Sequence, residues 1–292
     1  MTPNESVAVE LGAVQETLLI PLLGRARETA KKERGVLADP RALEIVESLD
    51  YDFSKWEDIP SLLGCCIRTK MYDRYVEDFL AKHPEGTVIE LGSGLNTRFE
   101  RMDNGTVHWF DLDLPDVITL RRKFFQDTSR RTMVSASVLD DAWVDQVKAS
   151  PGPYLFLSEA VLIYLEEAKV KEAVGLIARN FPGATLVLDT TGANSVDGQK
   201  NHDAMRHLSP DSWFRWKCDD PKQLEDWGLG LELTSSKTFL DADDSIIAKL
   251  PFMWRTLVKF TPWLLRIRMG KYRLNAFSVT QSAGDDFATV KD

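Results

Sequence analysis

Apolar residues recur with one period in the first part of the chain and with another after residue 86. "ETLLIPLLGRARETAKKER" consists mainly of long helix-forming side chains, and "CCIRTKMYDRYVEDFLAKHP" repeats apolar groups at Ile67, Met71, Tyr75 and Phe79. This spacing predicts helices over residues 1 to about 80, the last of which ends at Pro84 and Gly86.

From Thr87 onward, short β-rich runs alternate with helical stretches, the pattern of a parallel sheet with crossover helices. We expect strands at 87–91, 106–111, 131–136, 153–158 and 184–190. "EEAKVKEAVGLIARNFPG" has a helical period and predicts a helix before the fifth strand, and β character resumes in "LELTSSKTFL" and "YRLNAFSVTQ".

Two later segments allow alternative interpretations. Residues 193–230 carry Trp213, Phe214, Trp216 and Trp227 among polar residues, as in a cover over a substrate or as core filling. "LPFMWRTLVKFTPWLLRIRMG" carries too many cations for a transmembrane helix, so it is either an amphipathic surface element in contact with a membrane or a packed helix pair; the cations are Arg255, Lys259, Arg266 and Arg268.

Composition narrows the functional classes. The 292 residues include 36 Lys and Arg against 45 Asp and Glu, a net charge of -9 that argues against nucleic acid as a partner. The three cysteines and four histidines show no metal-binding spacing, so we expect no metal and a reducing compartment. The opening "MTPNESVAVELGAV" is not a secretory signal, which favours a soluble cytoplasmic protein; the oligomeric state is left open.

The stretch "TVIELGSGLNTR" joins a buried strand to a glycine turn at Gly92 and Gly94. A dinucleotide fingerprint would have a third glycine at Thr97, and Glu90 just ahead of the turn would repel a pyrophosphate. Acids that could bind ribose follow about 20 residues later in "VHWFDLD". S-adenosylmethionine, which has an adenosine but no phosphate, fits this pattern, and an NAD-dependent oxidoreductase is the alternative.

Four ordered segments then resemble one known family: "VIELGSGLNTRFERM", "VHWFDLDLPDVITLRRKFF", "SASVLDDAWVDQV" and "FLSEAVLIYLEEAKVKEAVGLIARNFPGATLVLD". They look like the class I S-adenosylmethionine-dependent methyltransferases that include leucine carboxyl methyltransferases and tetracenomycin-pathway polyketide O-methyltransferases. The resemblance implies an α/β Rossmann-like fold with a seven-stranded, mostly parallel sheet whose last strand is antiparallel. It also implies an N-terminal helical cap (1–84), a cofactor-binding core (85–192), a substrate-cover insertion (193–230) and C-terminal strands and helices (231–282). The composition of "AGDDFATVKD" predicts a flexible tail (283–292).

The resemblance implies the cofactor-binding residues Arg68, Glu90, Gly92, Ser93, Gly94, Asp113, Ser137, Val138 and Glu159, with Arg25 as a further candidate. Asp113 would bind the ribose hydroxyls, with Asp111 as its rival, and Glu159 would approach the cofactor's amino group, since its buried carboxylate would otherwise lack a partner. Arg68 would grip the cofactor's carboxylate with its planar fork.

Ser137 stands where the family commonly has an adenine-binding aspartate. Ser137 with the Val138 backbone could take over that contact, Asp140 could substitute, or the residues could only cap a loop. Tyr164 and His202 are the candidates for a catalytic role, and the substrate candidates are His202, Arg206 and Arg215, for which a solvated helix is the alternative.

A carboxylate acceptor needs no base, so the lack of an obvious catalytic dyad favours methylation of a carboxyl group or an acidic phenol. The resemblance implies an O-methyltransferase for a small, polyketide-like aromatic molecule that releases S-adenosylhomocysteine. The alternatives are a protein C-terminal carboxyl methyltransferase, a non-catalytic cofactor-binding protein on the same scaffold, and the oxidoreductase named above.

Overall fold

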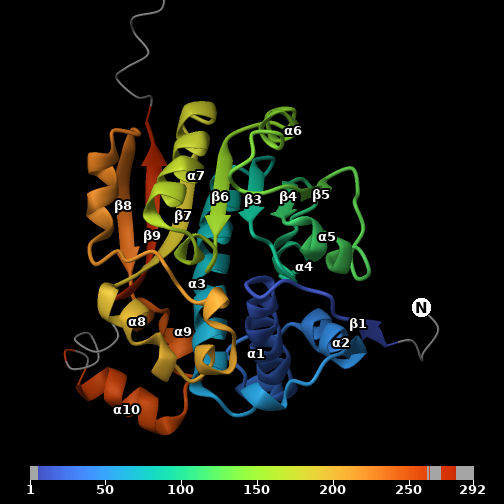
Figure 1. Cartoon of the computed structure of the whole chain (residues 1–292), viewed down its shortest axis with the longest axis vertical. Coiled ribbons are helices and arrows are strands. Elements are labelled where there is room, and N and C mark those ends of the chain that lie inside the picture. Colours follow the sequence, from blue (N-terminus) through green and yellow to red (C-terminus); the bar gives the residue numbers. More distant parts are fainter. Residues whose placement is uncertain (1–5, 262, 264–270, 281–292) are drawn as a thin grey trace, which may run out of the picture.

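A mixed β-sheet forms the centre of the computed structural model, which describes residues 6–261, 263 and 271–280 (Figure 1). In these ranges the sheet has seven strands in the order β5-β4-β3-β6-β7-β9-β8. The strands are β3 (Thr87–Leu91), β4 (His108–Asp113), β5 (Arg131–Ser135), β6 (Tyr154–Ser158), β7 (Thr185–Thr191), β8 (Leu231–Lys237) and β9 (Tyr272–Val279). Only β9 runs antiparallel to its neighbours β7 and β8, so the predicted fold class is confirmed.

The second strand differs most from its predicted position, at His108–Asp113 in place of 106–111, whereas the bounds of the other four predicted strands agree to within one residue. The side chain of Asn104 accepts hydrogen bonds from the backbone N–H groups of Thr106 (3.0 Å) and Val107 (2.8 Å), so these residues form a turn. At its other end the strand continues because Asp113 pairs with Ser135 of β5. The shift puts Asp113 at the carboxyl edge of the sheet.

Helices cover both faces of the sheet, and alternate strand residues pack against them. Val88 belongs to the core beneath α3 (Pro60–Lys82) and α9 (Asp244–Ile247), whereas Ile89 belongs to the core beneath α6 (Val144–Lys148) and α7 (Glu167–Asn180). Helices α3 and α7 confirm the two helices predicted from apolar spacing. Two short helices, α4 (Arg98–Met102) and α5 (Pro115–Arg121), follow β3 and β4.

The N-terminal part forms a cap below the carboxyl ends of the parallel strands (Figure 1). It consists of α1 (Leu19–Ala30), α2 (Pro40–Ser48) and the short parallel pair β1 (Val7–Ala8) and β2 (Leu49–Asp50). The cap has its own apolar core, which also takes in Ile118 from α5 and Met205 from the predicted cover. The cap, the sheet and the cover therefore meet in one place.

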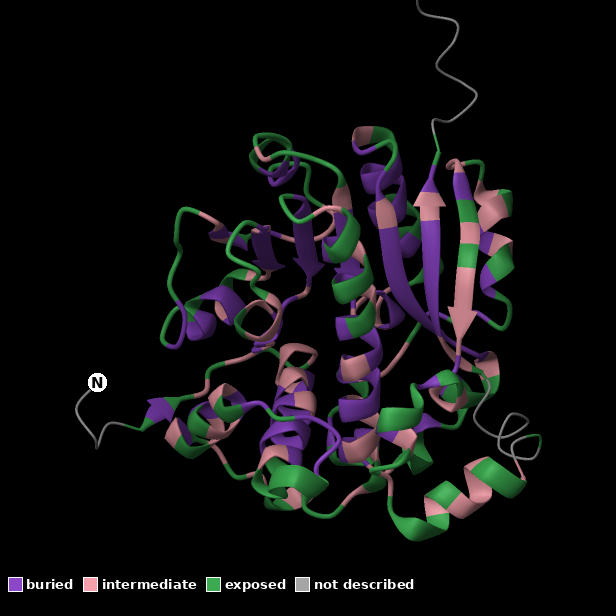
Figure 2. Ribbon diagram, turned by 180° about the vertical axis from the view of Figure 1, so that it is seen from behind, coloured by how far each residue is buried: buried purple, intermediate pink, exposed green. Residues whose placement is uncertain are grey.

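The predicted cover, 193–230, begins with α8 (Ala193–Asp197) and continues as short 3-10 turns. Of its aromatic residues, Trp216 is buried in the sheet's core, so the cover interpretation is wrong for this side chain. The burial colouring in Figure 2 contrasts the buried strands with α10 (Phe252–Phe260), an exposed helix at the edge of the molecule. No helix in the described ranges is long and apolar enough to cross a membrane. The predicted tail and the cations Arg266 and Arg268 lie outside those ranges.

Candidate functional site

A cavity of about 900 Å³ lies between the carboxyl edge of the sheet, the cap and the cover. All ten residues that the sequence suggested for the cofactor line it: Arg25, Arg68, Glu90, Gly92, Ser93, Gly94, Asp113, Ser137, Val138 and Glu159. Because they come from α1, α3, β3, β4, β6 and the loops that follow, the fold gathers residues that are up to 134 positions apart, from Arg25 to Glu159.

The glycine turn after β3 needs its glycines for conformation and for space. Gly92 and Gly94 have φ angles of +67° and +49°, which favour glycine. A Cβ atom at Gly92 would come within 2.4 Å of the Cγ2 atom of Val161. The backbone N–H groups of Gly92 and Ser93 both donate to the carbonyl of Leu112, which ties the turn to β4. The backbone can therefore approach a ligand closely here.

Asp111 and Asp113 have different surroundings, although both are on β4. Asp111 is fully buried between Arg121 (2.8 Å) and Arg131 (2.6 Å) and does not line the cavity. Asp113 lines it, and its carboxylate accepts hydrogen bonds from the backbone N–H groups of Gly94 (2.7 Å) and Leu114 (2.8 Å). Burial raises the pKa of Asp113 to about 6. Of the two, Asp113 alone can reach a ligand in this cavity.

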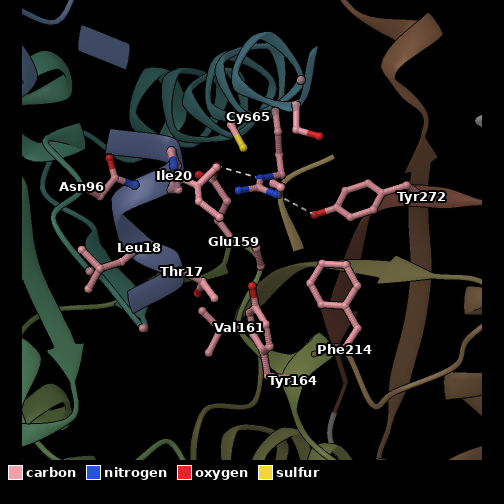
Figure 3. Close-up of a pocket in the computed structure, with 18 of the residues that line it drawn as sticks. Thr17, Leu18, Ile20, Cys65, Asn96, Glu159, Val161, Tyr164, Phe214 and Tyr272 are labelled. Atoms are coloured by element: carbon pink, nitrogen blue, oxygen red, sulfur yellow. Dashed lines mark hydrogen bonds and ion pairs between the residues drawn. The ribbon is translucent and has the colours of Figure 1, made fainter. Parts of the chain in front are cut away.

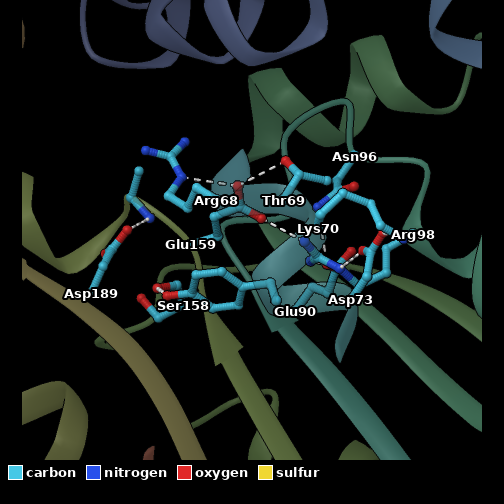
Figure 4. A network of polar contacts seen from close by, with 12 residues as sticks. Arg68, Thr69, Lys70, Asp73, Glu90, Asn96, Arg98, Ser158, Glu159 and Asp189 are labelled. Atoms are coloured by element: carbon cyan, nitrogen blue, oxygen red, sulfur yellow. Dashed lines mark hydrogen bonds and ion pairs between the residues drawn. The ribbon is translucent and has the colours of Figure 1, made fainter. Parts of the chain in front are cut away.

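A buried arginine, Arg98, holds three carboxylates at the back of the cavity (Figure 4). It forms ion pairs with Asp73 of α3 (2.8 Å), Glu90 of β3 and Glu159, which follows β6. Burial by itself would raise the pKa of Glu159, but the charges of Arg98 and Arg68 outweigh burial, and the pKa lies below its ordinary value. The network keeps Glu159 negatively charged.

The expectation that Glu159 lacks a protein partner is wrong. Its carboxylate accepts hydrogen bonds from Arg68 (3.0 Å), Thr69 (3.0 Å) and Arg98 (Figure 4). Glu90 also repels a phosphate less than its charge alone predicts, because the guanidinium of Arg98 pairs with that charge. Burial raises the pKa of Glu90 despite this pairing.

Arg68 is oriented by protein groups on two sides. Its Nε donates to Glu159 and its Nη1 donates to the hydroxyl of Tyr272 on β9 (3.0 Å). The Tyr272 hydroxyl in turn donates to Asp189 at the end of β7, and burial raises the pKa of Asp189 to about 6. Figure 3 shows Tyr272 on the opposite side of the cavity from Leu18. Two of the three guanidinium nitrogens of Arg68 are therefore already engaged, which leaves Nη2 for a ligand.

Arg25 has a structural task that the sequence did not reveal. It is buried, its Nε pairs with Asp39 (2.9 Å) and its Nη2 donates to the carbonyl of Leu95 (2.7 Å). Asp39 also caps the start of α2 by accepting from the N–H of Ala42 (3.0 Å). Arg25 thus connects the cap to the loop that follows the glycine turn.

Ser137 and Asp140 cap a loop together, as one of the three alternatives expects. The N–H of Ser137 donates to Asp140 (2.9 Å), and the hydroxyl of Ser137 accepts from the N–H of Leu139 (3.1 Å). Ser137 and Val138 nevertheless line the cavity, whereas Asp140 does not. A substitution of Asp140 for the family's aspartate therefore finds no support in this geometry.

The candidates for catalysis and substrate contact separate into two groups. Tyr164 and His202 line the cavity, and the ring of Tyr164 packs at 5.2 Å from that of Phe214 (Figure 3). Arg206 is exposed and Arg215 forms an exposed pair with Glu166 (3.5 Å), and neither lines the cavity. The structure does not bring these two arginines to the site, because this segment forms short 3-10 turns instead of a helix with one shared face.

Three residues at the site, Arg98, Asp73 and Tyr272, were not predicted from the sequence. Arg98 stands inside the quoted stretch "TVIELGSGLNTR", six residues after Gly92, but an arginine after a glycine turn is usually solvated and its burial depends on α3. Tyr272 comes from the last strand, which joins the site only through the antiparallel pairing with β7.

Comparison with known proteins identifies the family. The family model described as leucine carboxyl methyltransferase matches residues 19–178, which include all ten cofactor candidates. The chain belongs to the leucine carboxyl methyltransferase family. It is 32% identical, over 236 residues, to tetracenomycin polyketide synthesis O-methyltransferase TcmP of Streptomyces glaucescens, covering 80% of this chain and 86% of that relative.

Among solved structures, a DUF574 family protein from Streptomyces avermitilis has a similar fold, with a TM-score of 0.53, 14% sequence identity and coverage of 87% of this chain and 96% of that chain. Membership of the family confirms the predicted enzyme class, an S-adenosylmethionine-dependent O-methyltransferase.

Proposed function

We propose that this member of the leucine carboxyl methyltransferase family methylates an oxygen atom of a small, polyketide-like aromatic molecule and releases S-adenosylhomocysteine. The observation that carries the proposal is a cavity with two kinds of wall. The ten expected cofactor residues form one wall, which we call the cofactor wall, and the remaining wall is largely apolar. The relative TcmP, which is named as an O-methyltransferase of tetracenomycin polyketide synthesis, supports the acceptor class.

The polar atoms of the cofactor wall fit S-adenosylmethionine. Glu90 Oε2, Ser93 Oγ and Asn96 Oδ1 are buried on this wall without a hydrogen-bond partner among the described residues. Unpaired buried polar atoms are costly, so their clustering along one wall favours a polar ligand there. In this proposal Glu90, Ser93 and Gly94 lie along the methionine part of the ligand.

The remaining cofactor contacts follow from charge and position. The carboxylate of Asp113 can accept hydrogen bonds from both ribose hydroxyls. Arg68 has Nη2 available for a carboxylate, and the negatively charged Glu159 beside it suits an ammonium group. Ser137 and Val138 would border the adenine. Arg25 would support the cap rather than contact the ligand, because both Asp39 and Leu95 engage it.

The acceptor would lie against the apolar wall, which includes Leu18, Ile20, Tyr164, Phe214 and Trp254. A volume of about 900 Å³ lies at the upper end of the range for small-molecule sites, which leaves room for an acceptor beside the cofactor. Flat aromatic molecules suit such a wall, since Tyr164 and Phe214 can pack against their faces.

When bound, S-adenosylmethionine supplies a methyl group on a sulfonium for in-line displacement. The protein's part is to align the acceptor oxygen and to exclude water. Burial raises the pKa of Tyr164 to about 12, so its hydroxyl stays protonated at neutral pH and can donate a hydrogen bond but cannot act as a base. Burial lowers the pKa of His202, so its ring is neutral near pH 7. The Nδ1 atom accepts hydrogen bonds from the backbone N–H groups of Ala204 (3.3 Å) and Met205 (3.4 Å), so the ring has to turn away from them before it can take a proton from a phenol. With that rotation His202 is the candidate base for a phenolic acceptor, and a carboxylate acceptor needs none.

The test is an incubation of the purified protein with S-adenosylmethionine and a panel of aromatic carboxylic acids, phenols and a peptide that ends in leucine. We expect mass spectrometry to find one added methyl group on an aromatic acid or phenol, and calorimetry to find S-adenosylhomocysteine binding. Asp113→Ala should weaken that binding, whereas Asp103→Ala, which removes an acid paired with Arg130 outside the cavity, should not. Methylation of the peptide alone, or binding of NAD in place of S-adenosylhomocysteine, would contradict the proposal.

A further inference from the structure

Helix α10 (Phe252–Phe260) carries large apolar side chains on two sides. Trp254 and Val258, one turn apart, line the cavity. Phe252, Met253 and Phe260 point away from it, with 76%, 65% and 69% of their surface exposed. Together with Trp263, which is 62% exposed, they are the exposed large hydrophobic side chains of the described residues. We call these four residues the outer apolar patch.

Basic side chains accompany the outer apolar patch, although the chain as a whole carries a net charge of -9. Lys249, Arg255 and Lys259 are all exposed, and residues 249–263 contain no Asp or Glu. The nearby acids Asp243 and Asp244 precede this stretch, and the charge of Asp243 acts on Arg74 of α3. Exposed aromatic groups beside cations, on a helix without acids, are typical of helices that lie in the headgroup region of a negatively charged membrane.

We propose that α10 docks this protein on the surface of a lipid bilayer that contains negatively charged lipids. Phe252, Met253, Phe260 and Trp263 enter the headgroup region, while Lys249, Arg255 and Lys259 contact lipid phosphates. Because the net charge of the protein repels such a surface, contact is confined to this helix, within the screening length of about 8–10 Å at physiological salt.

A second copy of the chain fits this surface less well. Two copies that met through α10 would bring Arg255 and Lys259 of each against those of the other, and no acid of residues 249–263 could offset the repulsion. Phosphate headgroups offer both the opposite charge and an apolar layer immediately beneath it. The bilayer therefore satisfies both features of the surface together.

Docking through α10 would also affect how the acceptor reaches the cavity, an inference that rests on the proposed function. Since Trp254 and Val258 of the same helix line the cavity, an apolar acceptor dissolved in the bilayer would reach the cavity wall without passing through bulk water. The docking itself does not depend on which acceptor is used, so its test does not involve methyl transfer.

The test is flotation of the full chain with vesicles of phosphatidylcholine alone and of phosphatidylcholine mixed with phosphatidylglycerol. We expect the protein to float with the mixed vesicles and to be released by raised salt. Phe252→Ser combined with Phe260→Ser should lower the bound fraction about tenfold or more, and Arg255→Glu combined with Lys259→Glu should do the same. Neither pair lines the cavity, so S-adenosylhomocysteine affinity should be unchanged and would show that the variants fold.

A matched control is Lys169→Glu combined with Lys171→Glu on the exposed side of α7, which changes the net charge equally but leaves α10 intact. These substitutions should not alter flotation. Three results would overturn the proposal: no flotation of the unaltered protein, equal flotation of the Arg255 and Lys259 variant, or a dimer in solution that the Phe252 and Phe260 variant abolishes.

Discussion

Asp113 is a half-buried acid that has to be ionised to accept hydrogen bonds from two hydroxyl groups. Its pKa of about 6 means that it is mostly charged at pH 7 and mostly protonated at pH 5. A protonated carboxyl loses acceptor capacity, so ligand affinity is lost as pH falls through that pKa. We expect the affinity for S-adenosylhomocysteine, measured by calorimetry, to fall about tenfold from pH 7 to pH 5.

Asp113→Asn and Asp189→Asn test which acid causes this step, the fall in S-adenosylhomocysteine affinity between pH 7 and pH 5. Asp189 has a similarly raised pKa but does not itself line the cavity; its carboxylate accepts hydrogen bonds from the Tyr272 hydroxyl and from the backbone N–H of Ala160 (2.8 Å). Asp113→Asn should bind weakly and without the step, whereas Asp189→Asn should keep it. A full step in Asp113→Asn would show that another group titrates.

Arg98 is the residue on which the buried charges depend. With methionine in its place, the buried carboxylates of Asp73, Glu90 and Glu159 would lose the cation that they share. Removing one partner of a buried ion pair typically lowers the stability of a protein by about 3–5 kcal/mol. We expect Arg98→Met to lower the free energy of unfolding, measured with urea, by about that amount.

Arg74→Met is the control on α3, because its pairs with Glu77 and Asp78 are exposed and should matter little. Adding Glu90→Gln to Arg98→Met removes one of the stranded charges and should restore part of the stability. A double variant no more stable than the single one would argue against electrostatics as the cause.

At the scale of elements, a polar contact fastens the cover to the start of α3. Asp203 accepts from the backbone N–H of Ser61 (2.9 Å) and from its hydroxyl, at the start of α3. Both residues line the cavity. Ser61→Ala removes one of these bonds, worth about 1 kcal/mol, and should speed hydrogen exchange in residues 199–208 severalfold.

Asp197→Ala provides the comparison within the same segment, because Asp197 pairs with Lys217 at an exposed position. It should leave exchange in residues 199–208 unchanged. Equal exchange in the unaltered protein and Ser61→Ala would mean that the apolar contacts of Met205 alone hold the cover.

The sequence predicted the helices and strands whose apolar residues recur with a regular period. Helices α3 and α7 each bury one face, and β3 is buried along its whole length, so their apolar patterns match their environment. The segment 193–230 has no single period because it consists of short 3-10 turns, and only tertiary contacts distinguish Phe214 at the cavity from Trp216 in the core.

The site divides in a similar way. Turn chemistry and resemblance led to Gly92, Gly94 and Asp113, which all line the cavity. Arg98 could not be predicted from turn chemistry or resemblance, because the three carboxylates that surround it come from α3, β3 and the loop after β6. A buried ion network depends on packing between distant segments, and a sequence does not display it.

On the scale of the whole molecule, the cavity is the junction of cap, sheet and cover. A ligand bound there contacts all three parts and should stabilise the entire chain by mass action. At about one hundred times its dissociation constant, S-adenosylhomocysteine should add about 2.7 kcal/mol to the free energy of unfolding. The measurement is thermal unfolding with increasing ligand, and NAD at equal concentration should cause no shift.

The strand order also affects how the protein is made. β9 lies between β7 and β8 in the sheet but follows both in the chain, and β8 pairs with no other described strand. During synthesis, β8 therefore waits without a partner and the outer edge of β7 stays open until Tyr272–Val279 has left the ribosome. A nascent chain that stops before Tyr272 already contains almost every residue of the cavity wall. It would still expose two unpaired strand edges, which are the features that chaperones shield and that aggregation exploits.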